Sequence, residues 1–201
     1  MGKSQPPDEH FEALIEAARA AEPWAVGELW RRYQPRLRGY IGTLEPGAAD
    51  DICSETWISV GRSLPRFRGA EPDFRSWLFT IAHRRLCDHR RRTGRSQILL
   101  AAAGDSDGAE PVCSAESDAL EREGTRRALA LIAALPPDQA QVVLLRTLAG
   151  LDSDRVAAVV GKRPGTVRVL AHRGLRNLAK RLDGARLSMP ADEPAARRPG
   201  A

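Results

Sequence analysis

The stretch from Gly161 to Lys180, GKRPGTVRVLAHRGLRNLAK, contains the side chains whose chemistry is easiest to interpret. It has six Lys or Arg residues and no Asp or Glu. Guanidinium and ammonium groups neutralise phosphates, and Arg can also pair with the edge of guanine, so this pattern favours binding to DNA. A solvated basic face on a purely structural helix is the alternative interpretation. The net charge of +5 for the whole chain agrees with a polyanionic partner.

A second group of candidate residues is acidic. Asp50, Asp51 and Glu55 fall within about one helical turn and are expected to form an acidic ridge, with Ile52 and Trp57 beside it for burial. A cluster that only caps the helix and aids solubility is the structural alternative. Carboxylates also bind Mg²⁺, so a nuclease site made with His83, Asp88 or His89 is a further possibility. The spacing of these groups does not favour it.

Cysteine spacing and hydropathy exclude other classes of protein. Cys53, Cys87 and Cys113 lie far apart and form no C-x-x-C pair, so neither a disulfide framework nor a thiolate zinc site is expected. No apolar run approaches the roughly 20 residues that span a bilayer, and the N-terminal segment has no signal-peptide core. We therefore expect a protein of the reducing cytosol, without membrane insertion, metal or cofactor.

Charge divides the chain into segments. Residues 62–95 contain ten Arg against three acidic residues, whereas residues 96–118 contain five acidic residues and no Lys or Arg. The acidic segment is also rich in Gly, Ser and Pro, which predicts a flexible linker. The expected organisation is a first domain over 8–95, a linker over 96–118, a second domain over 119–183 and a disordered tail over 184–201.

Three helices of the first domain follow from apolar residues at helical spacing. AVGELWRRYQPRLRGYI has a core stripe, interrupted by Pro35, that consists of Leu29, Trp30, Tyr33, Leu37, Tyr40 and Ile41. AADDICSETWISVGRSL places Ile52, Thr56, Val60 and Leu64 on one face. PDFRSWLFTIAHRRLCDHRRR is expected to have Asp73 as its cap and to bury Phe74, Trp77, Leu78, Phe79, Ile81 and Leu86. No convincing strand pattern is present, so the predicted fold class is all-α, with two small helical domains.

The second domain ends in a helix-turn-helix pattern. LDSDRVAAVVG predicts a short helix that is capped by Asp152 or Ser153, buries Val156, Ala157 and Val160, and ends at Gly161. Pro164 suits the first turn of the next helix. The expected inner stripe of that helix is Val167, Leu170, Ala171, Gly174, Leu178 and Leu182, and its outward side chains are Arg168, His172, Arg173, Arg176 and Lys180. Early outward residues of such a helix reach bases in the major groove.

Both domains resemble conserved regions of the extracytoplasmic-function (ECF) sigma factors of bacterial RNA polymerase. The resemblance to the fourth region lies in Leu135-Pro136, Gly150-Leu151, Gly165-Thr166-Val167-Arg168 and His172-Arg173. The resemblance to the second region lies in Asp51, Ile52, Glu55, Thr56, Trp57, Phe67-Arg68-Gly69, Phe74, Trp77-Leu78, Ile81-Ala82, Asp88 and Arg91-Arg92. A helix-turn-helix alone is shared with many repressors, whereas the two regions in this order are specific.

The resemblance implies a role for each group of residues. Core polymerase binding falls to Asp50, Asp51, Ile52, Glu55 and Trp57, on a helix that docks on the clamp helices of the largest subunit. Binding of −10 DNA falls to Phe67, Arg68, Arg84, Asp88 and Arg91, with Phe67 as an exposed aromatic for a flipped base and Arg90, Arg92 and Arg95 near phosphates. Recognition of −35 DNA falls to Arg163, Thr166, Arg168, His172, Arg173, Arg176 and Lys180.

We therefore expect an ECF-type sigma factor that binds core RNA polymerase, directs it to −35 and −10 promoter elements, helps to melt the promoter and catalyses nothing itself. Its expected partners are core RNA polymerase, promoter DNA and an anti-sigma factor. A freestanding helix-turn-helix regulator is the first alternative, and it would not co-purify with core polymerase. A metal-dependent nuclease is the second, and it would cleave DNA in a reaction that EDTA abolishes.

Overall fold

The computed structural model describes residues 7–101 and 119–187, and all regular structure in these residues is helical. The first part forms α1 (Pro7–Arg19), α2 (Pro23–Leu44), α3 (Ala49–Ser63) and α4 (Glu71–Ala101), with 3-10 turns at Pro46–Ala48 and Leu64–Arg66. The second part forms α5 (Ala119–Ala133), α6 (Pro137–Thr147), α7 (Ser153–Val160) and α8 (Pro164–Leu187). The predicted all-α fold is confirmed.

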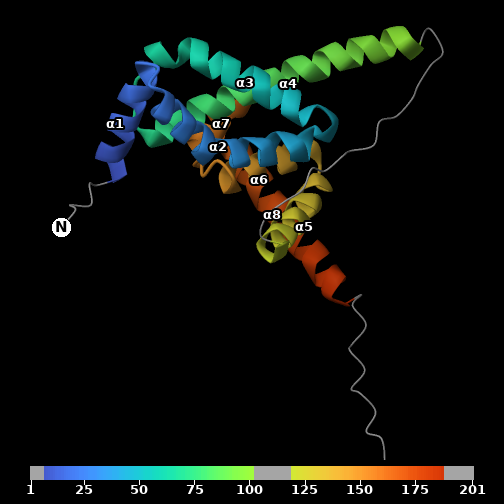
Figure 1. Cartoon of the computed structure of the whole chain (residues 1–201). Helices are drawn as coiled ribbons and strands as arrows, with labels where there is room; N and C mark the ends of the chain where they lie inside the picture. Colours follow the sequence, from blue (N-terminus) through green and yellow to red (C-terminus); the bar gives the residue numbers. More distant parts are fainter. Residues whose placement is uncertain (1–6, 102–118, 188–201) are drawn as a thin grey trace, which may run out of the picture.

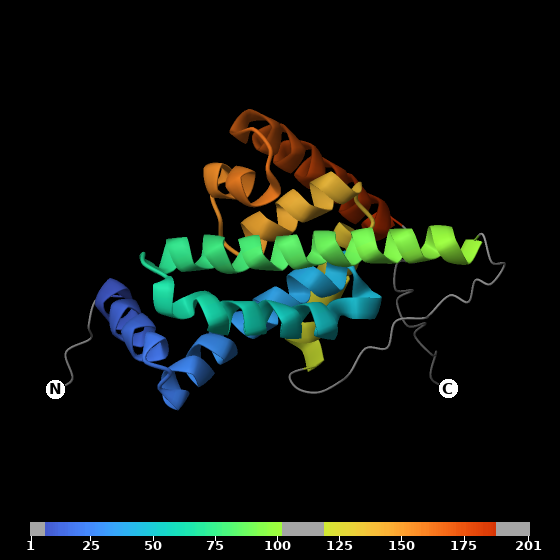
Figure 2. The same ribbon diagram turned by 90° about the horizontal axis from the view of Figure 1, so that it is seen from above.

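The helix α4 is the longest helix of the described residues and runs along the upper part of the view in Figure 1. Seen from above, it runs between α2 and α3 on one side and α6, α7 and α8 on the other (Figure 2). It packs against α3 and α2 of the first part and against α7 of the second, while α6 packs on both α2 and α8. The C-terminal turns of α4 extend past the other helices (Figure 1). The two parts of the chain are therefore in contact.

Proline positions explain where several helices begin. α2, α6 and α8 all start at a proline. The fixed φ of proline suits the first turn, and its lack of an N–H costs nothing there, because the N–H groups of the first turn have no hydrogen-bond partner within the helix. Pro35 differs because it lies inside α2, which continues through it to Leu44. The expected interruption at Pro35 is thus wrong. The lost backbone hydrogen bond is offset by burial of Tyr33 and Leu37 on either side.

The core of the first part is aromatic and largely follows the predicted stripes. Phe74 is fully buried, with its ring centroid 5.1 Å from that of Tyr33 and 5.7 Å from that of Phe11. All the predicted core residues of α2 except Trp30 are buried, and so are the four of the α3 stripe and Phe74, Leu78, Phe79 and Leu86 of α4. Trp77 and Ile81 are half-buried and pack against this core. Trp30 is 50% exposed, so its assignment to the core is wrong.

The ends of two helices differ from the expected domain limits. α4 continues beyond Arg95 to Ala101, because Ile98, Leu99, Leu100 and Ala101 are compatible with a helix and no proline stops it. α8 likewise continues beyond Asp183 to Leu187. The rest of the predicted linker, residues 102–118, and the predicted tail from residue 188 onward lie outside the described residues.

Candidate nucleic-acid and polymerase interfaces

The turn between α7 and α8 is built from features that the sequence predicts. The Asp152 carboxylate accepts hydrogen bonds from the backbone N–H groups of Arg155, at 2.8 Å, and Asp154, at 3.1 Å, which makes it the N-cap of α7. The bond from Arg155 is the main reason that the pKa of this carboxyl is lowered. Gly161, with a φ of +67°, ends α7 in the left-handed conformation that favours glycine. The helix-turn-helix is thereby confirmed.

Opposite faces of α8 have different environments. Val167 and Ala171 are buried, and a Cβ atom at Gly174 would lie 2.8 Å from Cγ2 of Val143, so α8 packs closely on α6. The predicted −35 residues are all exposed, namely Arg163, Thr166, Arg168, His172, Arg173, Arg176 and Lys180. Leu182 is also exposed, contrary to expectation, because α6 has 11 residues and cannot cover the whole of the 24-residue α8.

One side chain of the exposed basic face already has an internal partner. The Arg168 guanidinium lies 3.5 Å from the carboxylate of Asp154 on α7, and both side chains are mostly exposed. Exposed ion pairs of this kind contribute about 0–1 kcal/mol. Arg168 can therefore exchange this contact for a base or a phosphate at little cost.

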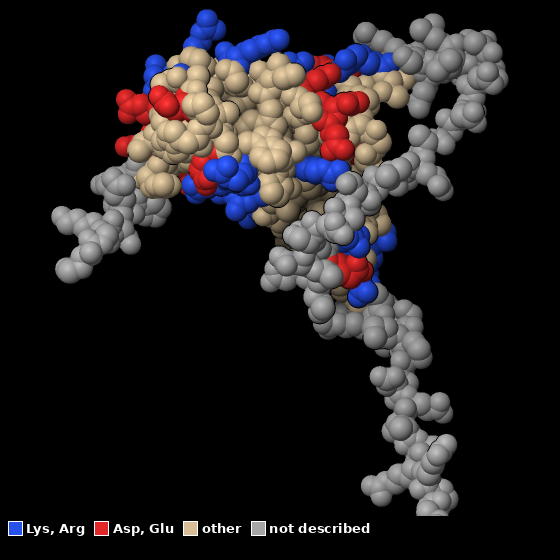
Figure 3. Space-filling model, viewed as in Figure 1, with Lys and Arg blue, Asp and Glu red and all other residues tan. Residues whose placement is uncertain are grey.

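The acidic ridge lies at the N-terminal end of α3 and consists of Asp50, Asp51 and Glu55. Asp50 and Asp51 are exposed, and Figure 3 shows acidic side chains gathered on this end of the molecule. Asp50 accepts two hydrogen bonds from Arg38, at 2.9 and 3.3 Å, and Glu55 lies 3.5 Å from Arg92 of α4. Acidic groups at the first turn also suit the helix dipole.

Two residues that were predicted to bind the polymerase, Ile52 and Trp57, are not part of the exposed acidic ridge. Ile52 is buried beneath α3, so it supports the ridge and cannot touch a partner, and its assignment as a contact residue is wrong. Its position follows from the same helical stripe as Thr56 and Val60. Trp57 is half-buried, and its indole N–H donates a 2.7 Å hydrogen bond to the Gln34 side chain. Part of the Trp57 ring remains accessible.

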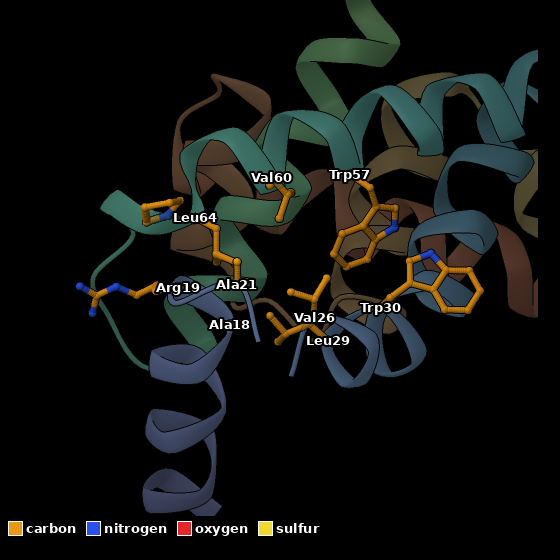
Figure 4. A pocket seen from close by; sticks show the side chains of 11 residues that line it. Ala18, Arg19, Ala21, Val26, Leu29, Trp30, Trp57, Val60 and Leu64 are labelled. Atoms are coloured by element: carbon orange, nitrogen blue, oxygen red, sulfur yellow. The ribbon is translucent and has the colours of Figure 1, made fainter. Parts of the chain in front are cut away.

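An apolar groove lies towards the other end of α3, between the end of α1, the first half of α2 and the last turns of α3 (Figure 4). Its free volume is about 250 Å³, and its lining includes Val26, Leu29, Trp30, Trp57, Val60 and Leu64. The rings of Trp30 and Trp57 lie at one end of it (Figure 4). This groove was not predicted from the sequence, although Val26 and Trp30 gave a signal: both are apolar residues of α2, and Val26 falls outside its core stripe.

Phe67 is not the exposed aromatic that was expected. Its side chain is only 8% exposed, and its ring lies 5.0 Å from that of Trp77 and 5.5 Å from that of Phe74. The following residue, Arg68, donates hydrogen bonds to the carbonyl oxygens of Phe67 and Pro65 at 2.7 and 3.0 Å and so fixes the backbone of this turn. The aromatic core of α4 thus extends to Phe67, and an unpaired base cannot stack on its face in this conformation.

The other predicted −10 residues line polar clefts along α4. Arg84 and Asp88 border a cleft of about 280 Å³ between α3 and α4 that also includes Ser59, Ser63 and Arg85. Arg85 donates a 2.7 Å hydrogen bond to the Ser59 hydroxyl, and Arg91 pairs with Asp88 at 2.9 Å. Ser59, Ser63 and Arg85 were not predicted, because only the three-dimensional packing brings α3 beside α4. The cleft joins cationic and hydroxyl donors suited to a nucleotide strand.

Arginines at the C-terminal end of α4 pair with acidic residues of the first domain. Arg90 lies 3.0 Å from Glu45, and Arg92 lies 3.5 Å from Glu55 of the ridge. The side chain of Arg95 lies outside the described residues. These ion pairs are partly exposed, so phosphates can compete with the carboxylates for the guanidinium groups.

Neither a metal cluster nor a membrane-spanning helix occurs in the part of the chain that the structure describes. His83 and Cys87 are neighbours on α4, with Nε2 and Sγ 3.6 Å apart, but within residues 7–101 and 119–187 no group of three His, Cys, Asp or Glu side chains could hold a metal ion. None of the helices in these ranges is long and apolar enough to cross a membrane.

Comparisons with known proteins match both parts of the chain. Residues 29–96 match sigma-70 region 2, and residues 125–178 match sigma-70 region 4. The ECF RNA polymerase sigma factor BldN of Streptomyces coelicolor is 34% identical over 176 residues, which are 86% of this chain and 66% of BldN. The ECF RNA polymerase sigma factor SigD of Mycobacterium tuberculosis is 31% identical over 179 residues, which are 85% of this chain and 82% of SigD.

Two solved structures share the fold. CnrH in complex with the cytosolic domain of CnrY is 21% identical, with a TM-score of 0.57 and coverage of 87% of this chain and 97% of that one. RpoE of Bartonella quintana in complex with the anti-sigma factor NepR is 19% identical, with a TM-score of 0.60 and coverage of 78% and 96%. With sigma-70 regions 2 and 4 both present and ECF relatives matching most of its length, the chain belongs to the ECF RNA polymerase sigma factors, which direct the polymerase to promoters and are not enzymes.

Proposed function

We propose that this chain docks on core RNA polymerase through the ridge and groove of region 2, holds unpaired −10 DNA along α4, and recognises the −35 element with α8. The observation that carries the proposal is the separation of charge within one chain. An acidic ridge lies on α3, and an exposed face of cationic side chains lies on the second helix of a helix-turn-helix. These surfaces suit a basic protein partner and DNA, respectively.

Gel filtration with core polymerase and promoter fragments tests this proposal. The chain should elute with the polymerase, and promoter-specific binding should require the polymerase. A freestanding regulator would bind its DNA site specifically without polymerase and would not elute with it, and that pair of results would reject the proposal.

The apolar groove on α1, α2 and α3 gives the proposed docking surface its apolar part. Exposed tryptophans that fill or border a pocket commonly supply much of the binding free energy of a protein interface. Trp30 and Trp57 line the groove, and Ile58, which is 54% exposed, extends the apolar surface along α3. We assign the groove, together with Asp51 and Glu55, to the polymerase interface.

Trp30→Ala should weaken association with core polymerase by about 30-fold, which is the effect of losing a hot-spot side chain worth about 2 kcal/mol. Trp24→Ala is the matched control, because Trp24 is also an exposed tryptophan of α2 but does not line the groove. Both variants should unfold at the same temperature as the parent, since neither side chain is buried. Equal affinities of the two variants for core polymerase would remove the groove from the interface.

We further propose that promoter melting moves the turn formed by residues 67–70. A base can stack on the Phe67 ring only after the turn moves away from Trp77 and Phe74, because the ring is buried against them. The Arg68 guanidinium holds the backbone of the turn and must release it for this movement. Base–aromatic stacking is worth about 1–3 kcal/mol per base, which is enough to offset the loss of these hydrogen bonds.

Phe67→Leu should slow promoter opening by about 5- to 160-fold while leaving duplex binding nearly unchanged, because leucine keeps an apolar side chain in the core but cannot stack on a base. Phe67→Ala is less suitable, since truncating a buried Phe costs about 3–5 kcal/mol of stability. A template with a pre-melted bubble should restore activity to the Leu variant. Parental opening rates on duplex promoter would show that Phe67 serves only the core.

An anti-sigma factor and a cytoplasmic location complete the proposal. CnrH and RpoE, which share this fold, were solved in complexes with CnrY and with the anti-sigma factor NepR. The exposed apolar groove is a surface that a soluble protein usually covers with a partner. A regulator of this kind would compete with core polymerase for the groove, and Trp30→Ala should weaken both interactions.

A further inference from the structure

The exposed face of α8 carries an apolar side chain among its cationic ones. Val169 is 48% exposed, although valine is among the residues most often buried in proteins. It lies two residues after Val167 and two before Ala171, both of which are buried. Because each residue turns an α-helix by about 100°, Val169 points about 160° away from each of them. Val169 is therefore opposite the side of α8 that packs on α6.

The neighbours of Val169 on this face are residues already assigned to −35 DNA. Around the helix axis, Arg176 lies about 20° from Val169, Arg173 about 40° and His172 about 60°. All three side chains are exposed. A duplex that meets these side chains must also meet Val169.

Arg168 lies nearer the edge of the same face. It directly precedes Val169, so its side chain points about 100° away from that of Val169. Its guanidinium lies 3.5 Å from the carboxylate of Asp154 on α7. The middle of the exposed face in the first turns of α8 is thus occupied by Val169. This residue was not predicted to contact the −35 element, because the prediction followed the polar and charged side chains.

An apolar side chain in the major groove has one favourable base-specific partner. Thymine presents its C5 methyl group there, whereas guanine, adenine and cytosine present hydrogen-bond acceptors and donors. Valine cannot bond with those groups, so it would displace their water without replacing the lost hydrogen bonds. Contact with the thymine methyl instead removes apolar surface of both partners from water.

We propose that Val169 reads the methyl group of one thymine in the −35 element and so determines specificity at that base pair. The proposal rests on the proposed assignment of α8 to −35 DNA. It adds burial of a methyl group to the hydrogen bonding expected of the arginines on the same helix. Uracil differs from thymine only in lacking this methyl group, so the contact can be removed from the DNA without changing its hydrogen-bonding groups.

The test uses core polymerase with this chain, and promoter fragments with the −35 element that the parent selects from a library. Each thymine of the element, on either strand, is replaced singly by deoxyuridine, and the affinity for each fragment is measured. At one position the parent should bind the uracil fragment about fourfold more weakly, which is the effect of burying one methyl-sized group. Val169→Ala should bind the thymine and uracil fragments equally at that position, because alanine lacks the methyl groups that make the contact.

Leu175→Ala is the matched control. Leu175 is also an exposed apolar residue of α8, but it lies about 120° from Val169 around the helix axis. Its variant should keep the parental difference between thymine and uracil. Alanine is the best helix former, so both variants should retain the helix content of the parent, which circular dichroism measures.

Three results would overturn the methyl contact and leave the assignment of α8 to −35 DNA intact. They are a defined −35 motif without thymine on either strand, parental affinity that no uracil changes, and a parental thymine preference that persists in Val169→Ala. A library selection that yields no −35 motif would instead reject the assignment of α8 and the methyl contact together.

Discussion

Replacing both Asp51 and Glu55 by Arg is expected to weaken binding to core polymerase by about 30- to 5,000-fold, because removing one partner of an interfacial charge pair costs about 2–5 kcal/mol. Asp51 is exposed, and the Glu55 side chain is 40% exposed, so neither change disturbs the core. Glu55→Arg also replaces the Glu55–Arg92 attraction with a repulsion, but this pair is mostly solvent-exposed and contributes little to stability.

The binding of labelled chain to core polymerase, titrated by fluorescence anisotropy, provides the measurement. Glu16→Arg is the matched control, since it reverses an exposed charge on α1, outside the segment that matches sigma-70 region 2. It should bind like the parent, and thermal unfolding should be similar for all three proteins. If the double variant retains parental affinity, the ridge does not dock on the polymerase.

Arg168→Ala and Arg173→Ala are each expected to relax the preference at one base pair of the −35 element, because a bidentate Arg–guanine contact is worth about 1–3 kcal/mol of discrimination. Both side chains are exposed near the start of α8, and the ion pair between Arg168 and Asp154 is too weak to prevent Arg168 from contacting a base. Selection from a −35 library with holoenzyme made from each variant measures the change in preference.

Lys180→Ala distinguishes base recognition from phosphate binding on the same helix. Lys180 lies farther along α8, and a phosphate contact there carries no sequence information. Its loss should weaken all promoters alike and reduce the slope of log affinity against log salt by about one unit. Parental base preferences in both Arg variants would show that a different face of α8 meets the bases.

Local signals in the sequence were enough to predict the helix-turn-helix. Asp152, Gly161 and Pro164 each act on the backbone within a few residues, so their effects do not depend on the rest of the fold. The exposed basic face of α8 followed from helical periodicity in the same way, since Val167 and Ala171 are buried on the opposite side. The chemistry of the −35 candidate site could therefore be proposed from residue types and spacing alone.

Features that depend on contacts between distant residues could not be predicted in this way. Phe67 is buried because Trp77 and Phe74 of the next helix lie against it, and Trp30 is exposed because Leu29 and Tyr33 already fill the core side of α2. The contact between Asp73 and Arg155 joins residues 82 positions apart, and nothing in the sequence indicates that they pair. Helical periodicity gives the stripe of a helix, but the neighbour that covers it comes only from the three-dimensional packing.

The central claim, that this chain directs core polymerase to promoters through two DNA elements, is tested most directly by sequencing the 5′ ends of transcripts made in vitro from genomic DNA. Core polymerase with this chain should start at a set of sites that share one −35 and one −10 motif, and core polymerase alone should not use them. Combining Arg168→Ala with Arg173→Ala should alter the −35 motif and leave the −10 motif unchanged. Transcripts with the same start sites in the presence and absence of the chain would contradict the account.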